Sequence, residues 1–271
     1  MRKALSLGIV TGREVLSQPL PWIVLSITAL LLLFSTVLPS FTLEPEGDLK
    51  FMMDVGLGGV GMSLLVIGLW PATTLLVDEL RERTALTLLS KPLSRSQYLL
   101  GRYLGIAGAL TVSAALLGAW FLACAWLTES QVLGARLDSW LEGFPREALP
   151  TPLLRWHLLG MVLLALAQAA VLCAVAVALS TLLGPLPNLA CCLAVFFLGH
   201  LGEHLPRTGG LWVWGLRAVV PHLACFETGE AVARGIPLPA SYVAACLGYA
   251  ALYVAAMLAV AIPLFERREL S

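Results

Sequence analysis

Long apolar runs alternate with short polar segments along the whole chain. Six runs are long enough to be considered as membrane spans, and they cover residues 20–38, 51–77, 99–127, 156–183, 189–205 and 241–264. A helix that crosses a bilayer needs about 17–25 apolar residues, so the fifth run is the shortest candidate. The runs are continuously apolar and lack the alternation of a transmembrane β-barrel. The pattern therefore predicts an all-α polytopic membrane protein with six transmembrane helices.

Composition supports the same class. The chain is 59% hydrophobic and 13% charged, with a mean hydropathy of +0.87, whereas soluble domains are roughly 25% charged. No internal repeat or linker is visible, so we expect one membrane domain over residues 1–271. No GxxxxGK[ST] loop occurs, which excludes a Walker-type ATP site. We expect neither a cofactor in this chain nor a nucleic-acid partner.

The distribution of basic residues predicts the orientation. With six spans, the segments on the side of the termini hold ten Lys and Arg residues, and the longer opposite loops hold seven. Basic residues concentrate on the cytoplasmic side, so we expect both termini in the cytoplasm and the protein in a bacterial inner membrane. Residues 1–18 are predicted to form an interfacial helix with Leu5, Ile9 and Leu16 near one face, and a frayed tail is the alternative.

Three connections are assigned from their polar composition. Residues 39–50 are predicted to be a short acidic turn on the outer side. Residues 128–155 contain prolines and mixed charges, so we expect an outer loop with a small amphipathic helix. Residues 184–188, GPLPN, are predicted to be the inner turn between the fourth and fifth spans.

Glycines mark where helices can approach closely. Gly101 and Gly105 form a GxxxG pair at the start of the third span, and Gly108 follows. Small residues at this spacing let helix backbones pack against each other. The spacing is compatible with packing inside the bundle and with packing between protomers.

One short motif has metal-ligand spacing. His200, Glu203 and His204 form HxxEH, in which two histidines four residues apart share a helix face. Zinc enzymes of this kind need a third ligand, and Glu227 and Glu230 are the only later outer candidates. Polar residues at the end of a span also occur simply because interfaces tolerate them. The motif is a weak metal candidate and leaves a membrane-embedded metalloenzyme as an alternative function.

The most informative segment is residues 78–105, a charged island between the second and third apolar runs. It holds five of the seventeen Lys and Arg residues, and each would cost roughly 2.5–3.5 kcal/mol at the bilayer centre. The island must therefore be exposed to water. Its leucines can form a short helix that Pro92 ends, and Ser94 resembles an N-cap for the third span.

The island resembles the signature of ABC-2-type transporter permeases. That signature joins an acidic-basic stretch to a TxxxLLSxPLSR segment and a YLLG[KR]xLG entry into the next span. The matching residues are Glu79, Arg81, Glu82, Arg83, Thr84, Leu88, Leu89, Ser90, Lys91, Pro92, Leu93, Ser94, Arg95, Tyr98, Leu99, Leu100, Gly101, Arg102, Leu104 and Gly105. The chain is most similar to the multi-component subgroup that includes permeases for nitrous-oxide-reductase maturation and gliding motility.

The resemblance implies a cytoplasmic coupling helix between spans two and three, docked on a separate ATPase that binds ATP and Mg. The implied coupling residues are Glu79, Arg81, Arg83, Thr84, Leu88, Leu89, Ser90, Pro92, Leu93, Ser94 and Arg95. It also implies a second permease subunit, alike or different, contact with membrane lipid, and export as the direction of transport. A non-transporting membrane scaffold is a further alternative. Gln168 is among the few polar residues at mid-depth, which favours a lipid-like or bulky amphipathic cargo.

Overall fold

The structure is a computed structural model that describes residues 2–37, 45–81, 94–141, 151–201, 220–229 and 238–267. Every regular element in these ranges is helical, which confirms the predicted all-α class. The elements are α1 (Arg2–Ser17), α2 (Pro19–Val37), α3 (Pro45–Arg81), α5 (Arg95–Leu141), α6 (Thr151–Ser180), α7 (Pro185–Leu201), the short 3₁₀ helix η2 (Ala224–Phe226) and α10 (Ala240–Arg267).

Five of these helices are long and apolar enough to cross a membrane. The spanning windows are Pro19–Thr36, Asp54–Thr74, Ser96–Leu127, His157–Ser180 and Ala240–Phe265. Each falls within or beside a predicted apolar run. The fifth predicted span, residues 189–205, corresponds to α7, which has 17 residues. At a rise of 1.5 Å per residue it is about 26 Å long, shorter than the ~30 Å hydrocarbon layer.

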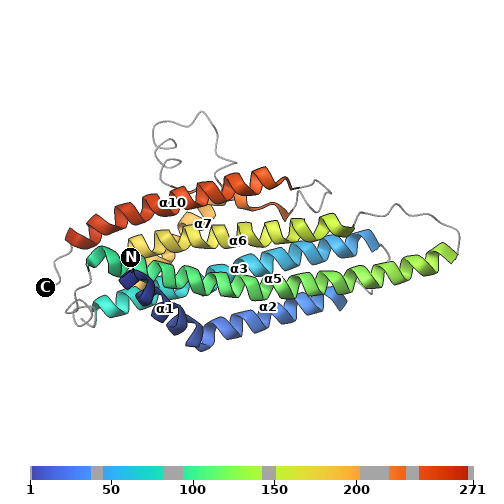
Figure 1. Cartoon of the computed structure of the whole chain (residues 1–271), viewed down its shortest axis with the longest axis horizontal. Coiled ribbons are helices and arrows are strands. Elements are labelled where there is room, and N and C mark those ends of the chain that lie inside the picture. The colour runs from blue at the N-terminus through green and yellow to red at the C-terminus, as the bar shows by residue number, and fades with distance from the viewer. Residues whose placement is uncertain are drawn as a thin grey trace.

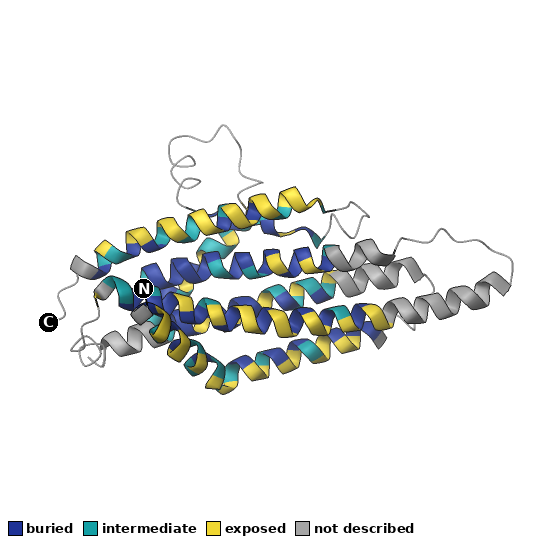
Figure 2. Ribbon diagram, viewed as in Figure 1, coloured by how far each residue is buried: buried dark blue, intermediate teal, exposed yellow. Residues whose placement is uncertain are grey.

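The long helices lie side by side in an elongated bundle (Figure 1). Helix α6 is central, because 72% of its spanning window is buried and it packs on α3, α5 and α10. Helix α10 lies at an edge, since only 22% of its window is buried. Figure 2 shows this difference, with α6 mostly buried and one long face of α10 exposed. Exposed apolar faces of this kind suit lipid or another membrane helix as their surroundings.

Proline is the first residue of three helices, α2, α3 and α7. Pro19 begins α2 directly after α1 ends at Ser17, and Pro185 begins α7 after a turn at residues 181–184. Proline suits the first helical position because its missing N–H would be unpaired there anyway. The predicted turn at 184–188 is therefore wrong for its last four residues. Asn188 lies inside α7, where its Nδ2 donates to the carbonyl oxygen of Ala176 at 3.0 Å.

Two helices are longer than their apolar runs. Helix α3 starts at Pro45, inside the predicted acidic turn, and α5 continues to Leu141 through part of the predicted outer loop. The expectation of a separate small amphipathic helix is thus wrong for residues 128–141. The apolar pattern reports the thickness of the hydrocarbon layer, and polar helical turns can extend beyond it.

Candidate functional site

The candidate site is the end of the bundle where α3 ends and α5 begins. Most of the predicted coupling residues lie outside the described residues: Arg83, Thr84, Leu88, Leu89, Ser90, Pro92 and Leu93. The backbone of Glu79 and Arg81 forms the last turn of α3, and Arg95 is the first residue of α5. The structure therefore describes the two helices that the predicted coupling segment joins.

Ser94 caps α5 at its start. Its Oγ accepts a hydrogen bond from the backbone N–H of Gln97 at 3.3 Å, and its carbonyl oxygen accepts from the N–H of Tyr98 at 3.1 Å. A side-chain oxygen that accepts from the third helical residue is the defining contact of an N-cap. The predicted N-cap is confirmed, so α5 has a fixed first turn directly after the coupling segment.

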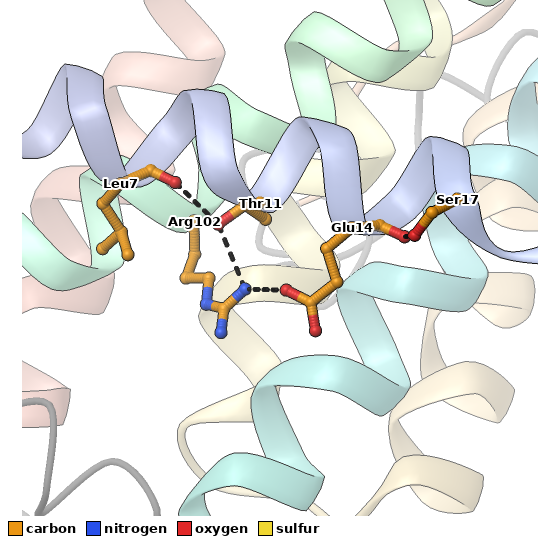
Figure 3. Close-up of polar contacts among 5 residues, drawn as sticks. All are labelled: Leu7, Thr11, Glu14, Ser17 and Arg102. Atoms are coloured by element: carbon orange, nitrogen blue, oxygen red, sulfur yellow. Dashed lines mark hydrogen bonds and ion pairs between the residues drawn. The ribbon is translucent and has the colours of Figure 1, made fainter.

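Arg102, two turns into α5, joins this helix to α1. Only 4% of the residue is exposed. Its Nη1 donates to Glu14 Oε2 at 2.9 Å and to Thr11 Oγ1 at 3.0 Å, as Figure 3 shows. Thr11 Oγ1 in turn donates to the carbonyl oxygen of Leu7 at 3.0 Å. A buried guanidinium is tolerated only when it is paired and hydrogen-bonded, so α1 supplies the partners that keep this cation inside the bundle.

Two GxxxG pairs pack against each other beside this ion pair. Gly8 and Gly12 lie on α1, and Gly101 and Gly105 lie on α5. A Cβ at Gly105 would be 2.6 Å from the carbonyl oxygen of Gly8, and one at Gly101 would be 3.0 Å from that of Ala4. Real Cβ contacts are not this short, so the close backbone approach needs glycine. Gly108 differs, because a Cβ there would meet nothing within 4 Å.

Helix α1 has two distinct faces. Thr11 and Val15 are buried, whereas Leu5 and Ile9 are 58% and 66% exposed. Leu16, which was predicted to share the face of Leu5 and Ile9, instead packs partly buried against the core. The helix is therefore fixed to α5 on one side and presents an apolar surface on the other.

The end of α10 meets the same region. The Tyr98 and Phe265 rings are stacked with centroids 6.0 Å apart, and both side chains are fully buried. The start of α5, the end of α10 and helix α1 consequently lie together at one end of the bundle (Figure 1). Residues 82–93, which connect α3 to α5 along the chain, lie outside the described residues.

Of the HxxEH motif, the structure describes only His200, and Glu203 and His204 lie outside the described residues. His200 Nε2 lies 3.0 Å from Glu227 Oε1 and 3.1 Å from Gln168 Nε2, and its Nδ1 lies 2.7 Å from the carbonyl oxygen of Phe196. Within the described ranges, no three His, Cys, Asp or Glu side chains are grouped closely enough to hold a metal ion. The structure therefore brings His200 together with Gln168 and Glu227.

Sequence reasoning missed the partners of α5 on α1. The sequence pattern assigned no partner to Glu14 or Thr11. The missed signal was the spacing of Gly8 and Gly12, a second GxxxG pair that matches Gly101 and Gly105. Such a pair predicts close packing but does not identify the helix that packs on it.

These features define a multi-pass helical membrane protein with a rigid helix junction at one end of its bundle. Residues 59–201, which are 143 of the 271 residues, match the family described as ABC-2 family transporter protein. The chain belongs to the ABC-2 transporter family and is a permease, the membrane subunit of an ABC transporter. Membership implies partnership with an ABC ATPase. No curated protein sequence matches the chain.

Proposed function

We propose that this permease transmits the motion of a separate ATPase subunit through residues 78–95 to its spans, and that it works as an exporter. The observation that carries the proposal is the junction of α1 with α5, held by Arg102 and Glu14 at 2.9 Å. This junction begins about two helical turns of α5 after the coupling segment. The matched family region, residues 59–201, includes the whole segment.

The junction would allow the coupling segment to transmit force to several helices at once. A force on residues 82–93 acts directly on the capped first turn of α5 and on the last turn of α3. Because α1 and α10 pack on the start of α5, these helices would move with it as one unit. ATP provides the work only if the nucleotide binds the two conformations of the assembly with different affinity.

The partners follow from this role. Each permease would dock one ATPase subunit and pair with a second permease, alike or different, within membrane lipid. ATP and Mg would be bound by the ATPase and not by this chain. The similarity of the island to multi-component permeases favours a system with additional proteins, such as those of nitrous-oxide-reductase maturation or gliding motility.

The orientation places the coupling segment in the cytoplasm. Helix α1, the start of α5 and the end of α10 lie at the same end of the bundle. An arrangement with both termini on one side of the membrane requires this. The basic residues of the island favour the cytoplasm for this end. The bacterial inner membrane is the corresponding location.

Cysteine labelling tests the orientation. In a cysteine-free background, single cysteines at Ser40, Ser139 and Thr208 should react with an impermeant maleimide in intact cells. Cysteines at Ser90 and Ser271 should react only after lysis. Reaction of position 90 from outside would contradict the orientation and the coupling role, since an ATPase could not reach the segment.

A further inference from the structure

Three polar side chains from separate elements meet away from the coupling end. Gln168 lies on α6, His200 lies at the end of α7, and Glu227 follows η2. The imidazole Nε2 of His200 is 3.0 Å from the Glu227 carboxylate and 3.1 Å from the Gln168 amide. We refer to these three residues as the polar cluster.

The polar cluster lies at mid-depth of the bundle. Gln168 is the central residue of the spanning window His157–Ser180, with eleven residues before it and twelve after it. Helix α7 runs back along α6 from Asn188 and ends at Leu201, beside Gln168. Ionisable residues at this depth are costly in lipid, and they usually face a bundle interior or a water-filled cavity.

The backbone beside the cluster is irregular. Residues 220–229 contain only the single turn of η2, and the Leu223 N–H donates to the carbonyl oxygen of Gly199 at 3.3 Å. A Cβ at Gly199 would lie 2.7 Å from Leu223 Cγ, so glycine permits this close packing. Non-helical backbone at membrane depth occurs only where it is buried in protein or lines an aqueous cavity.

The exposure of the His200 and Glu227 side chains indicates whether this segment is buried in protein or lines an aqueous cavity. His200 is shielded, with 19% of its side chain exposed, whereas 64% of the Glu227 side chain is exposed. A carboxylate that is exposed at this depth faces water or a ligand rather than hydrocarbon. The buried hydroxyl of Thr228, the next residue, has no hydrogen-bond partner within the described residues, so a further polar group lies beside this carboxylate.

The chemistry of the cluster favours a cation. The Glu227 carboxylate is the acidic group of the cluster, and among the described side chains it contacts no Lys or Arg. The Phe196 ring lies 4.4 Å from the His200 ring. Aromatic faces attract organic cations as carboxylates do, whereas they offer nothing to an anion.

We propose that Gln168, His200 and Glu227 form a binding site for an organic cation, such as the ammonium group of an amphipathic molecule, on the transport path of the permease. Glu227 supplies the charge, His200 holds that carboxylate in place, and Gln168 provides a polar wall. This inference rests on the proposed function, because a transport path is what an exposed carboxylate at mid-depth would line.

Binding of tetraphenylphosphonium to the purified permease in dodecyl maltoside tests the site. Tetraphenylborate, an anion of nearly the same size, is the matched control for apolar partitioning. Wild-type protein should bind the cation saturably and more tightly than the anion. Glu227→Gln should weaken cation binding by about tenfold, and Glu227→Asp should retain it. Asp54→Asn, which removes another exposed carboxylate, should leave binding unchanged.

Equal binding of both ions, or unchanged cation binding in Glu227→Gln, would overturn the site. If Glu227→Gln is not monodisperse, Gln168→Glu replaces it and should tighten cation binding, and a failure to do so would contradict the inference. Competition by phosphatidylethanolamine, with phosphatidylglycerol as its control, distinguishes a lipid amine from a free cation as the occupant. Because the assay uses the permease alone, its result is independent of whether an ATPase docks on residues 78–95.

Discussion

At the scale of single residues, Arg102 is the least expected feature of the permease. It lies within the spanning window Ser96–Leu127 yet is almost fully buried. An arginine near an interface can extend its charge toward water. The structure instead gives it Glu14 and Thr11 as partners and places its guanidinium 5.9 Å from the centre of the Tyr98 ring. Its role is to join two helices.

Removing Glu14 should therefore loosen the junction. Glu14→Ala leaves the buried guanidinium of Arg102 without its carboxylate, and loss of a fully buried partner costs about 3–5 kcal/mol. Because the Glu14 side chain is 42% exposed, solvent screening lowers the expected cost to about 1–2 kcal/mol. Thermal unfolding of the purified permease in detergent measures this loss.

The neighbouring exposed residue provides the control for that measurement. Arg13→Ala also removes one charge from α1 but should leave the unfolding temperature close to that of the wild type. The double variant Glu14→Ala with Arg102→Met should lose less stability than the two single variants added together, since each single variant already removes the contact between these two side chains. Additive losses would show that the two residues do not interact.

At the scale of elements, the closest packing is between α1 and α5. The GxxxG pair on each helix removes side chains from the contact, and backbone carbonyl oxygens then lie near the opposite Cα atoms. In a membrane the hydrophobic effect does not drive helices together. Close van der Waals packing, which small residues of this kind permit, drives their association instead. The ion pair of Arg102 and Glu14 fixes the register of the same contact.

Gly105 and Gly108 offer a matched pair of substitutions on one helix. Gly105→Ala should destabilise the permease by about 1–3 kcal/mol, because its methyl group would overlap the backbone of Gly8. Gly108→Ala adds the same methyl group where nothing lies within 4 Å, so it should be neutral or slightly stabilising. Thermal unfolding in detergent compares them, and equal effects of the two variants would contradict the assigned packing.

The sequence predicted the elements better than their ends and contacts. The apolar runs located the helices, since a hydrocarbon layer requires continuous apolar residues. They could not show that α5 continues to Leu141, because polar turns beyond the membrane are equally helical. The spacing of Gly101 and Gly105 predicted close packing, but the choice of α1 as partner depends on tertiary structure. His200 was identified through a metal motif for which Glu227 was a candidate further ligand, whereas its other described neighbour, Gln168, was not linked to it by any sequence pattern.

At the scale of the whole molecule, one end of the bundle combines the features that a coupling device needs. The last turn of α3 and the capped start of α5 enclose the coupling segment, while α1 and α10 pack on α5 there. The polar cluster of Gln168, His200 and Glu227 lies at mid-depth, away from this end. Motion of the coupling segment would reach the cluster through the packed helices α5 and α6, which are in direct contact.

The central claim is that an ATPase docks on residues 78–95, and co-purification from cells measures it most directly. A desolvated leucine contributes roughly 1.5–3 kcal/mol, whereas an exposed ion pair contributes about 0–1 kcal/mol. Leucines should therefore dominate the affinity, with Glu79, Arg83 and Arg95 setting the orientation.

Tagged wild-type permease should retain its ATPase, and so should Glu79→Ala, although with less transport per ATP hydrolysed. The double variant Leu88→Asp with Leu89→Asp should lose the ATPase while it remains inserted in the membrane and monodisperse in detergent. If this double variant retains the ATPase as well as the wild type does, residues 78–95 are not the docking site and the account of coupling is wrong.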